Sequence, residues 1–246
     1  MSGVILFPGS LPPGALVRGD LPSPAPVWLT ARADSLAFSP ILPGRVIEWR
    51  AQGGPVAQAV AANEHGTVFA TGALQFQAEV NGGLVVPDAI ADASCLTLGL
   101  IFRAGTPEAR TLLALQPLRA EGSLFLDAKA EVLRLAQKGG TTQLPLTAEG
   151  AADQVTLVLL ALQGGQVWLA ANGGAAVSAQ FSLETAGPAH LFLGCRGPRA
   201  GLRNKLGTFA LSDVLLWPGQ NLLATPGNAA LNGAITLWQH RARHGL

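Results

Sequence analysis

Apolar and polar residues alternate along the segment 74–80. Every second residue is apolar, namely Leu74, Phe76, Ala78 and Val80. Because successive side chains of a strand point to opposite faces, this period of two predicts a strand with one buried face. Short apolar runs predict further strands at residues 96–102, 111–115, 124–126, 132–136, 155–162, 167–171, 191–194 and 209–217.

Glycine pairs separate many of these runs. Gly164-Gly165 joins the runs 155–162 and 167–171, and glycine pairs also follow Asn81, Lys138 and Asn172. Glycine and Asn-Gly supply the positive φ that tight hairpins require. Many short strands punctuated in this way predict an antiparallel sandwich or barrel.

Residues 1–45 are rich in proline. Proline has no amide donor and fixes φ, so we expect neither a helix nor a central strand here. Apolar residues around Trp28 and Phe38 are a poor fit for a solvated linker. We therefore expect an extended arm over residues 1–45, lying on its own sandwich, on a neighbouring subunit or on a particle surface, before a β-sandwich over residues 46–227.

Residues 228–246 are the one segment predicted to be helical, as a short C-terminal tail. Its apolar side would contain Leu231, Ile235, Leu237 and Trp238. The pair Asn232-Gly233 is a point at which this helix could break in two, because glycine is a poor helix former.

The order of elements over residues 67–224 resembles laminin-G-like and concanavalin A-like lectin domains. The segments that carry the resemblance are 71–103, 111–136, 153–175 and 190–223; in the third, Trp168 takes the family's aromatic place and Asn172-Gly173 its Asn-Gly turn. The resemblance implies a two-sheet antiparallel jelly-roll sandwich. Lectins, glycanases and structural modules share this fold, so function has to be argued from a site.

Composition limits the classes of partner. Charged residues make up 13% of the chain, against about 25% in an average domain, and the net charge is +1. The protein therefore has no overall positive electrostatic field that would attract nucleic acid or an anionic membrane. The low charge favours either an oligomeric or assembled particle component or a neutral sandwich with Thr- and Gln-rich faces. The start lacks the pattern of a signal peptide and no run is long enough to span a membrane, so we expect cytoplasmic synthesis and no membrane insertion.

No catalytic motif is found. Glycanases of this fold use an E-x-D-x-x-E strand, and the nearest pair, Asp127 and Glu131, is expected at a solvated turn. No cofactor is expected; a calcium site stays a weak alternative because the acids Asp88, Asp92, Asp153 and Asp213 are scattered. His240 and His244 are spaced to share a metal but lack a third ligand. Cys95 and Cys195 are expected as free buried thiols unless the fold brings them together.

Two features are candidates for ligand binding. One is a glycine-rich loop with the residues Arg196, Arg199, Arg203, Asn204 and Lys205. Arginine binds carboxylates through paired hydrogen bonds, so the loop would suit an acidic polysaccharide; the alternative is a contact with solvent or another subunit. The other feature is Trp168 with Asn172, which could stack on a sugar and read its hydroxyls. Core packing is the alternative for Trp168, and also for Trp49.

The most economical hypothesis is a non-enzymatic glycan-binding or adhesion module. The excess of arginine over lysine and the residues 1–45 suggest a bacteriophage or phage-like particle, as a tail, spike or fibre protein on the virion surface that recognises bacterial surface polysaccharide. Residues 1–45 would then contact other particle proteins and further copies in a homo-oligomer. The alternatives are a structural virion component without a ligand and a divergent glycoside hydrolase.

Overall fold

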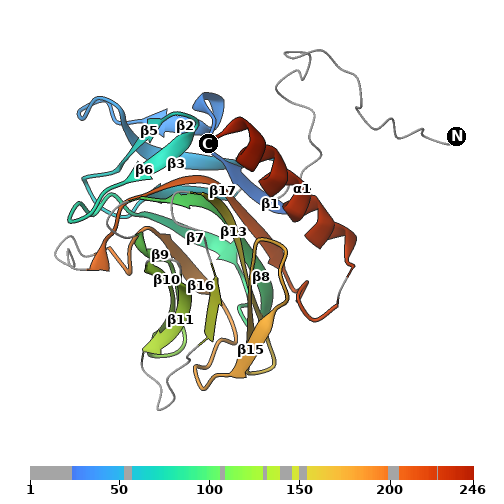
Figure 1. Cartoon of the computed structure of the whole chain (residues 1–246). Coiled ribbons are helices and arrows are strands. Elements are labelled where there is room, and N and C mark those ends of the chain that lie inside the picture. The colour runs from blue at the N-terminus through green and yellow to red at the C-terminus, as the bar shows by residue number, and fades with distance from the viewer. Residues whose placement is uncertain are drawn as a thin grey trace, which may run out of the picture.

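The structure is a computed structural model that describes residues 24–52, 57–105, 109–129, 132–138, 146–149, 154–198, 205–225 and 227–246. Two antiparallel sheets pack face to face (Figure 1). Sheet I contains, in spatial order, β15 (Val177–Gln180), β14 (Gln166–Ala171), β13 (Val155–Gln163), β8 (Cys95–Ala104) and β17 (Phe209–Pro218), with β6 (Ala73–Phe76) and β1 (Val27–Thr30) sharing the far edge of β17. The all-β sandwich expected from the sequence is confirmed.

Sheet II contains β12 (Leu146–Glu149), β11 (Val132–Lys138), β10 (Ser123–Lys129), β9 (Arg110–Pro117), β16 (Ala189–Leu193), β7 (Leu84–Ile90) and β4 (Gln58–Ala61). The long strand β3 (Arg45–Gln52) joins the two sheets. It pairs with β4, with β1, and with the short strands β2 (Leu36–Phe38) and β5 (Thr67–Ala70). One 3-10 turn, Ala33–Ser35, separates β1 from β2.

The main core lies between the sheets, and a second apolar layer lies outside sheet I. On β13, Val158 and Leu160 face the main core, whereas Leu157 and Leu159 face the helix α1 (Ala229–His244). Because both faces of β13 are covered, its sequence is continuously apolar rather than alternating. The turn from β13 to β14 has Gly164 and Gly165 at φ 57° and 76°, the tight hairpin that the glycine pair predicts.

The helix α1 is continuous from its N-cap Asn228, whose side chain accepts a hydrogen bond from the Ala230 N–H. The helix predicted over residues 228–246 therefore does not break at Asn232-Gly233, the point at which the sequence left a break open. Burial of Ala234 and Leu237 against sheet I outweighs the weak helix propensity of one glycine.

A buried ion pair attaches the C-terminal half of α1 to sheet I. The Asp213 carboxylate of β17 is fully buried, and it accepts hydrogen bonds from Arg241 Nε at 2.9 Å and from Trp28 Nε1 at 2.9 Å. Arg241 also donates to Thr30 Oγ1 at 2.8 Å. One carboxylate thus joins α1, β17 and β1.

Two sequence-based boundaries need correction. Residues 27–30 pair with β17, and Trp28 and Leu29 also pair with β3, so the sandwich includes them and the predicted arm cannot extend to residue 45. Proline does not prevent this, because Pro24 and Pro26 lie before the strand and not within it. Residues 1–23 are outside the described part of the chain.

The strand predicted over residues 74–80 ends at Phe76. Leu74 and Phe76 are buried as expected, but Glu79 has φ 65° and the Val80 side chain is exposed. The alternation therefore continues by coincidence through a turn. Phe76 is held by Gly194: a Cβ at Gly194, which has φ 69°, would overlap the phenyl ring.

Candidate functional site

Polar side chains gather on the outer face of sheet II, where β9 and β10 run side by side. Alternate residues of β10 point away from the main core, which places Phe125 and Asp127 on this face. Thr111 lies opposite Asp127 on β9, and Arg134 lies opposite it on β11. The pleat of three adjacent strands thus builds one polar cluster.

Arg196, which follows β16, completes the cluster from above the sheet. Its Nη2 donates to both Asp127 oxygens at 2.9 and 2.8 Å, and its Nε donates to Thr111 Oγ1 at 3.0 Å. The guanidinium also lies over the Phe125 ring, 4.2 Å from the centroid. We call Arg196, Asp127, Thr111, Phe125 and Arg134 the Arg196 cluster.

The loop that carries Arg196 is packed onto the sheet. Cys195 and Leu206, at its two ends, are buried with Phe125 and Phe192 in a separate apolar group on the outer face. The described parts of this loop therefore have a fixed position, and Arg196 is a structural anchor as well as a cation.

The cluster carries more positive than negative charge. Asp127 is buried between two guanidinium groups, of which Arg196 is mostly covered and Arg134, at 3.4 Å, keeps a 60% exposed side chain. Lys205 is exposed at the far end of the loop. One carboxylate cannot neutralise two guanidiniums, so Arg134 retains capacity to bind an external anion.

Further polar groups continue along the same face. Gln116 of β9 is exposed and lies opposite His190 of β16. The His190 ring nitrogen Nδ1 lies 3.2 Å from the Pro87 carbonyl oxygen, and its ring packs edge-on against Phe192. The outer face thus combines a cation with amide and imidazole groups over a buried aromatic layer.

The structure divides the predicted binding residues between opposite sides of the sandwich. Trp168 is half-buried on the outer face of sheet I, since its neighbours Val167 and Leu169 face the main core. Asn172 has φ 54°. Its side-chain oxygen accepts a hydrogen bond from the Leu157 N–H, and its own N–H donates to the Leu157 carbonyl. The residues therefore do not form one site with Arg196.

The remaining predictions have mixed outcomes. Arg199, Arg203 and Asn204 lie outside the described residues. Asp127 is not a solvated turn carboxylate, since it is buried in β10, and Trp49 is fully buried with its Nε1 donating to Thr30.

The sequence did not identify Arg134 as a candidate. One charged residue among the apolar positions of 132–136 is a weak signal of a binding site, because every second residue of a strand with one exposed face is usually polar.

Neither cysteine of the chain forms a disulfide: Cys95 and Cys195 are both free. Burial raises the pKa of the Cys195 thiol to about 12. Among the described residues no three His, Cys, Asp or Glu side chains are grouped to hold a metal ion, and Asp213 is used by Arg241. In that part of the chain, α1 is too short and too polar to cross a bilayer.

A groove of about 710 Å³ lies elsewhere, between α1 and the ends of β1 and β17. Proline, alanine, tryptophan and leucine line most of it, and Gln220 and Thr236 are its polar members. A sugar presents many hydroxyls that need hydrogen-bond partners, so this groove is a poor glycan site.

No family model and no curated protein matches the chain. Solved structures do match. Trypanosoma rangeli sialidase, in complex with 2,3-difluoro-KDN, has a TM-score of 0.59 at 17% identity over 87% of this chain and 32% of the sialidase. The binding domain of botulinum neurotoxin serotype D has a TM-score of 0.57 at 8% identity, over 87% of this chain and 51% of that domain. The binding domain of botulinum neurotoxin serotype G has a TM-score of 0.55 at 11% identity, over 88% of this chain and 51% of that domain.

These likenesses establish the fold alone. The chain spans about a third of the sialidase and about half of each toxin domain. At such low identity no activity follows from them. Membership of the concanavalin A-like family stays a prediction.

Proposed function

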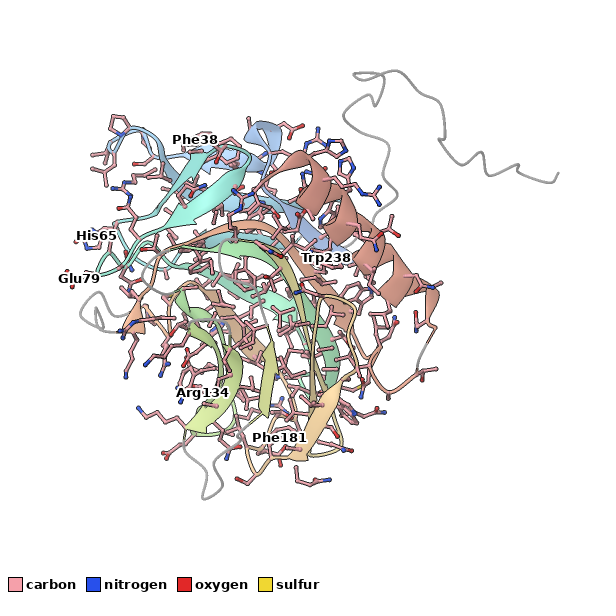
Figure 2. All side chains as sticks on the ribbon, viewed as in Figure 1. Phe38, His65, Glu79, Arg134, Phe181 and Trp238 are labelled. Carbon is pink, nitrogen blue, oxygen red and sulfur yellow. The ribbon has the colours of Figure 1, made fainter. Side chains whose placement is uncertain are left out.

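We propose that the chain is a non-enzymatic module that binds an acidic glycan on the outer face of sheet II. The observation that carries this proposal is the Arg196 cluster, in which a single buried carboxylate holds two guanidinium groups. Figure 2 labels Arg134 at the surface of that sheet. Sugar carboxylates or sulfates are the groups that an arginine fork binds best.

The residues of the cluster have different roles in this proposal. Arg134 contacts the acidic group of the glycan. Gln116 and His190 lie five residues further along β9 from Thr111, about 17 Å away, so they would contact a different sugar unit of the same chain. Arg196 is a positioning residue that fixes the start of the loop on the sheet. The sialidase supports a saccharide ligand, because it has been solved in complex with sialic acid.

We further propose that the glycan is a bacterial surface polysaccharide and that the module belongs to a phage or phage-like particle. The support is the composition, in which arginine far exceeds lysine and charge is scarce. A structural particle component without a ligand is the second candidate. The structure gives no support to a hydrolase at Asp127, because both of its oxygens accept hydrogen bonds from a guanidinium group and it therefore has no proton to donate.

A glycan array and a titration with the best acidic ligand test the proposal. Arg134→Gln removes one charge-assisted interaction of about 1.5 kcal/mol, so affinity should fall about tenfold. Arg243→Gln is the matched control, because it removes the same charge from an exposed position on α1. The proposal is wrong if no acidic glycan binds, or if both variants weaken binding equally. Release of reducing sugar that Asp127→Asn abolishes would instead establish the hydrolase.

A further inference from the structure

Two imidazole rings lie side by side at the C-terminal end of α1. His240 and His244 are about one helical turn apart, and their ring centroids are 4.6 Å apart with the ring planes tilted by 45°. Side chains four residues apart lie on the same face of a helix, so this proximity follows from the spacing. The structure thus brings together the two histidines that the sequence spaces for a shared metal.

The two rings have no other polar partner. In the part of the chain that the structure describes, neither ring makes a hydrogen bond or an ion pair, whereas His190 Nδ1 lies 3.2 Å from the Pro87 carbonyl oxygen. Burial, followed by repulsion from His244, lowers the pKa of His240, so its ring is mostly neutral at about pH 7. A metal ion binds the neutral form of a histidine ring, so His240 has neither a protein contact nor a proton to lose before it binds.

The separation of the rings indicates which coordination geometry fits. A histidine nitrogen binds a metal at about 2.0–2.1 Å, and the ring centroid lies about 1.1 Å beyond that nitrogen, so each centroid would be about 3.2 Å from the ion. Two centroids at that distance are about 4.5 Å apart at a right angle and about 5.2 Å apart at a tetrahedral angle. The observed 4.6 Å matches the right angle, which adjacent ligands make in a tetragonal complex of Cu²⁺ or Ni²⁺.

The helical turn that carries the pair is fixed on the sandwich. Arg241, which directly follows His240, pairs with the buried Asp213 carboxylate at 2.9 Å, so its charge is largely neutralised. Arg243 is exposed, and water and salt screen its repulsion of a cation. The last turn of a helix also carries a partial negative charge, which favours a bound cation.

We propose that His240 and His244 together bind one Cu²⁺ ion through adjacent coordination positions, with water in the remaining positions. Among divalent metals Cu²⁺ has the highest affinity for nitrogen ligands, which favours it over Ni²⁺ at the same geometry. Helix α1 covers the outer face of sheet I, whereas the Arg196 cluster lies on the outer face of sheet II (Figure 1). The metal site is therefore independent of the proposed glycan binding.

Titration of the full chain with CuCl₂, without an added histidine tag, tests the site. His240→Gln and His244→Gln should each lower the Cu²⁺ affinity at least about tenfold, because losing even an outer partner of a metal ligand costs about 10–100-fold. His65→Gln is the matched control, since it removes an exposed histidine from the loop after β4, and it should bind Cu²⁺ as the wild type does. Melting of each variant without metal checks that its fold is intact.

Electron paramagnetic resonance counts the nitrogen ligands directly. A single equivalent of Cu²⁺ should show splitting from two ring nitrogens in the wild type and from one in either single variant. Saturating Cu²⁺ should also raise the melting temperature of the wild type but not of the double variant His240→Gln/His244→Gln, because a ligand of the folded state stabilises it.

Three results would overturn the proposal. The first is a wild-type chain that binds Cu²⁺ no more tightly than the double variant. The second is an equal loss of affinity in His65→Gln, which would indicate unspecific binding to surface histidines. The third is a wild-type spectrum with splitting from one nitrogen alone.

Discussion

Replacing Asp213 with asparagine tests the ion pair that attaches α1 to the sandwich. The Asp213 carboxylate is fully buried and accepts four hydrogen bonds, from Trp28, Ser212 and twice from Arg241. Asparagine keeps the size of the side chain but replaces one acceptor oxygen with a donor. Some of these donors would then lose their partner, and the Arg241 guanidinium would lose its counter-charge.

The expected loss of unfolding free energy is about 3 kcal/mol. Breaking a buried ion pair by removing one partner costs about 3–5 kcal/mol. The lower value applies because the Arg241 side chain keeps 23% of its exposure and can regain some water. For a domain of this size, about 3 kcal/mol lowers the melting temperature by about 6–12 °C.

Urea unfolding followed by tryptophan fluorescence measures this loss, since Trp28 is a direct partner of the carboxylate. Asp34→Asn is the control, because its pair with Arg32 is exposed and should contribute at most about 0.5 kcal/mol. The double variant Asp213→Asn/Arg241→Gln should be less destabilised than the sum of the single variants, by about 2 kcal/mol. A loss below about 1 kcal/mol, or strictly additive effects, would refute the reasoning.

Three further predictions concern other positions. Gly194→Ala should destabilise the fold by about 3 kcal/mol or prevent folding, because the methyl group meets a phenyl ring at positive φ, whereas Gly197→Ala, with open space around it, should melt as the wild type does. Burial raises the pKa of Cys195 from its ordinary 9.0 to about 12, so the stability that the neutral thiol contributes is present below pH 9 and is lost as the pH rises toward 12. In unfolding measured against pH, Cys195→Ala should therefore lose less unfolding free energy at alkaline pH than the wild type does. Backbone hydrogen bonds, first that from Ser94, lower the pKa of Asp92 below 3.8, so its contribution is present above pH 3.8 and is lost as the pH falls through the lower folded value; Asp92→Asn should make acid unfolding less steep.

Features set by short-range chemistry were predictable from the sequence. The hairpin between β13 and β14 follows from Gly164-Gly165, because two residues with positive φ select one turn type. The burial of both faces of β13 is consistent with its unbroken apolar run. The segment 74–80 shows the limit of this approach, since a period of two cannot distinguish a strand from a strand followed by a turn.

The candidate site depends on contacts between residues far apart in the chain. Arg196 and Asp127 are separated by 69 positions, and only the order of strands in sheet II brings them together. The sequence predicted an arginine-rich loop but assigned Asp127 to a solvated turn. Their pairing, and with it the importance of Arg134, could not be derived without the register of β9, β10 and β11.

The contact of Asp213 with Trp28 and Arg241 has a consequence for synthesis on the ribosome. Trp28 belongs to the first described strand, whereas Arg241 is translated after every strand of the sandwich. A nascent chain can therefore pair its sheets while the Asp213 carboxylate still lacks its cation. We expect the emerging domain to remain open to proteases and chaperones until α1 has left the exit tunnel and docked.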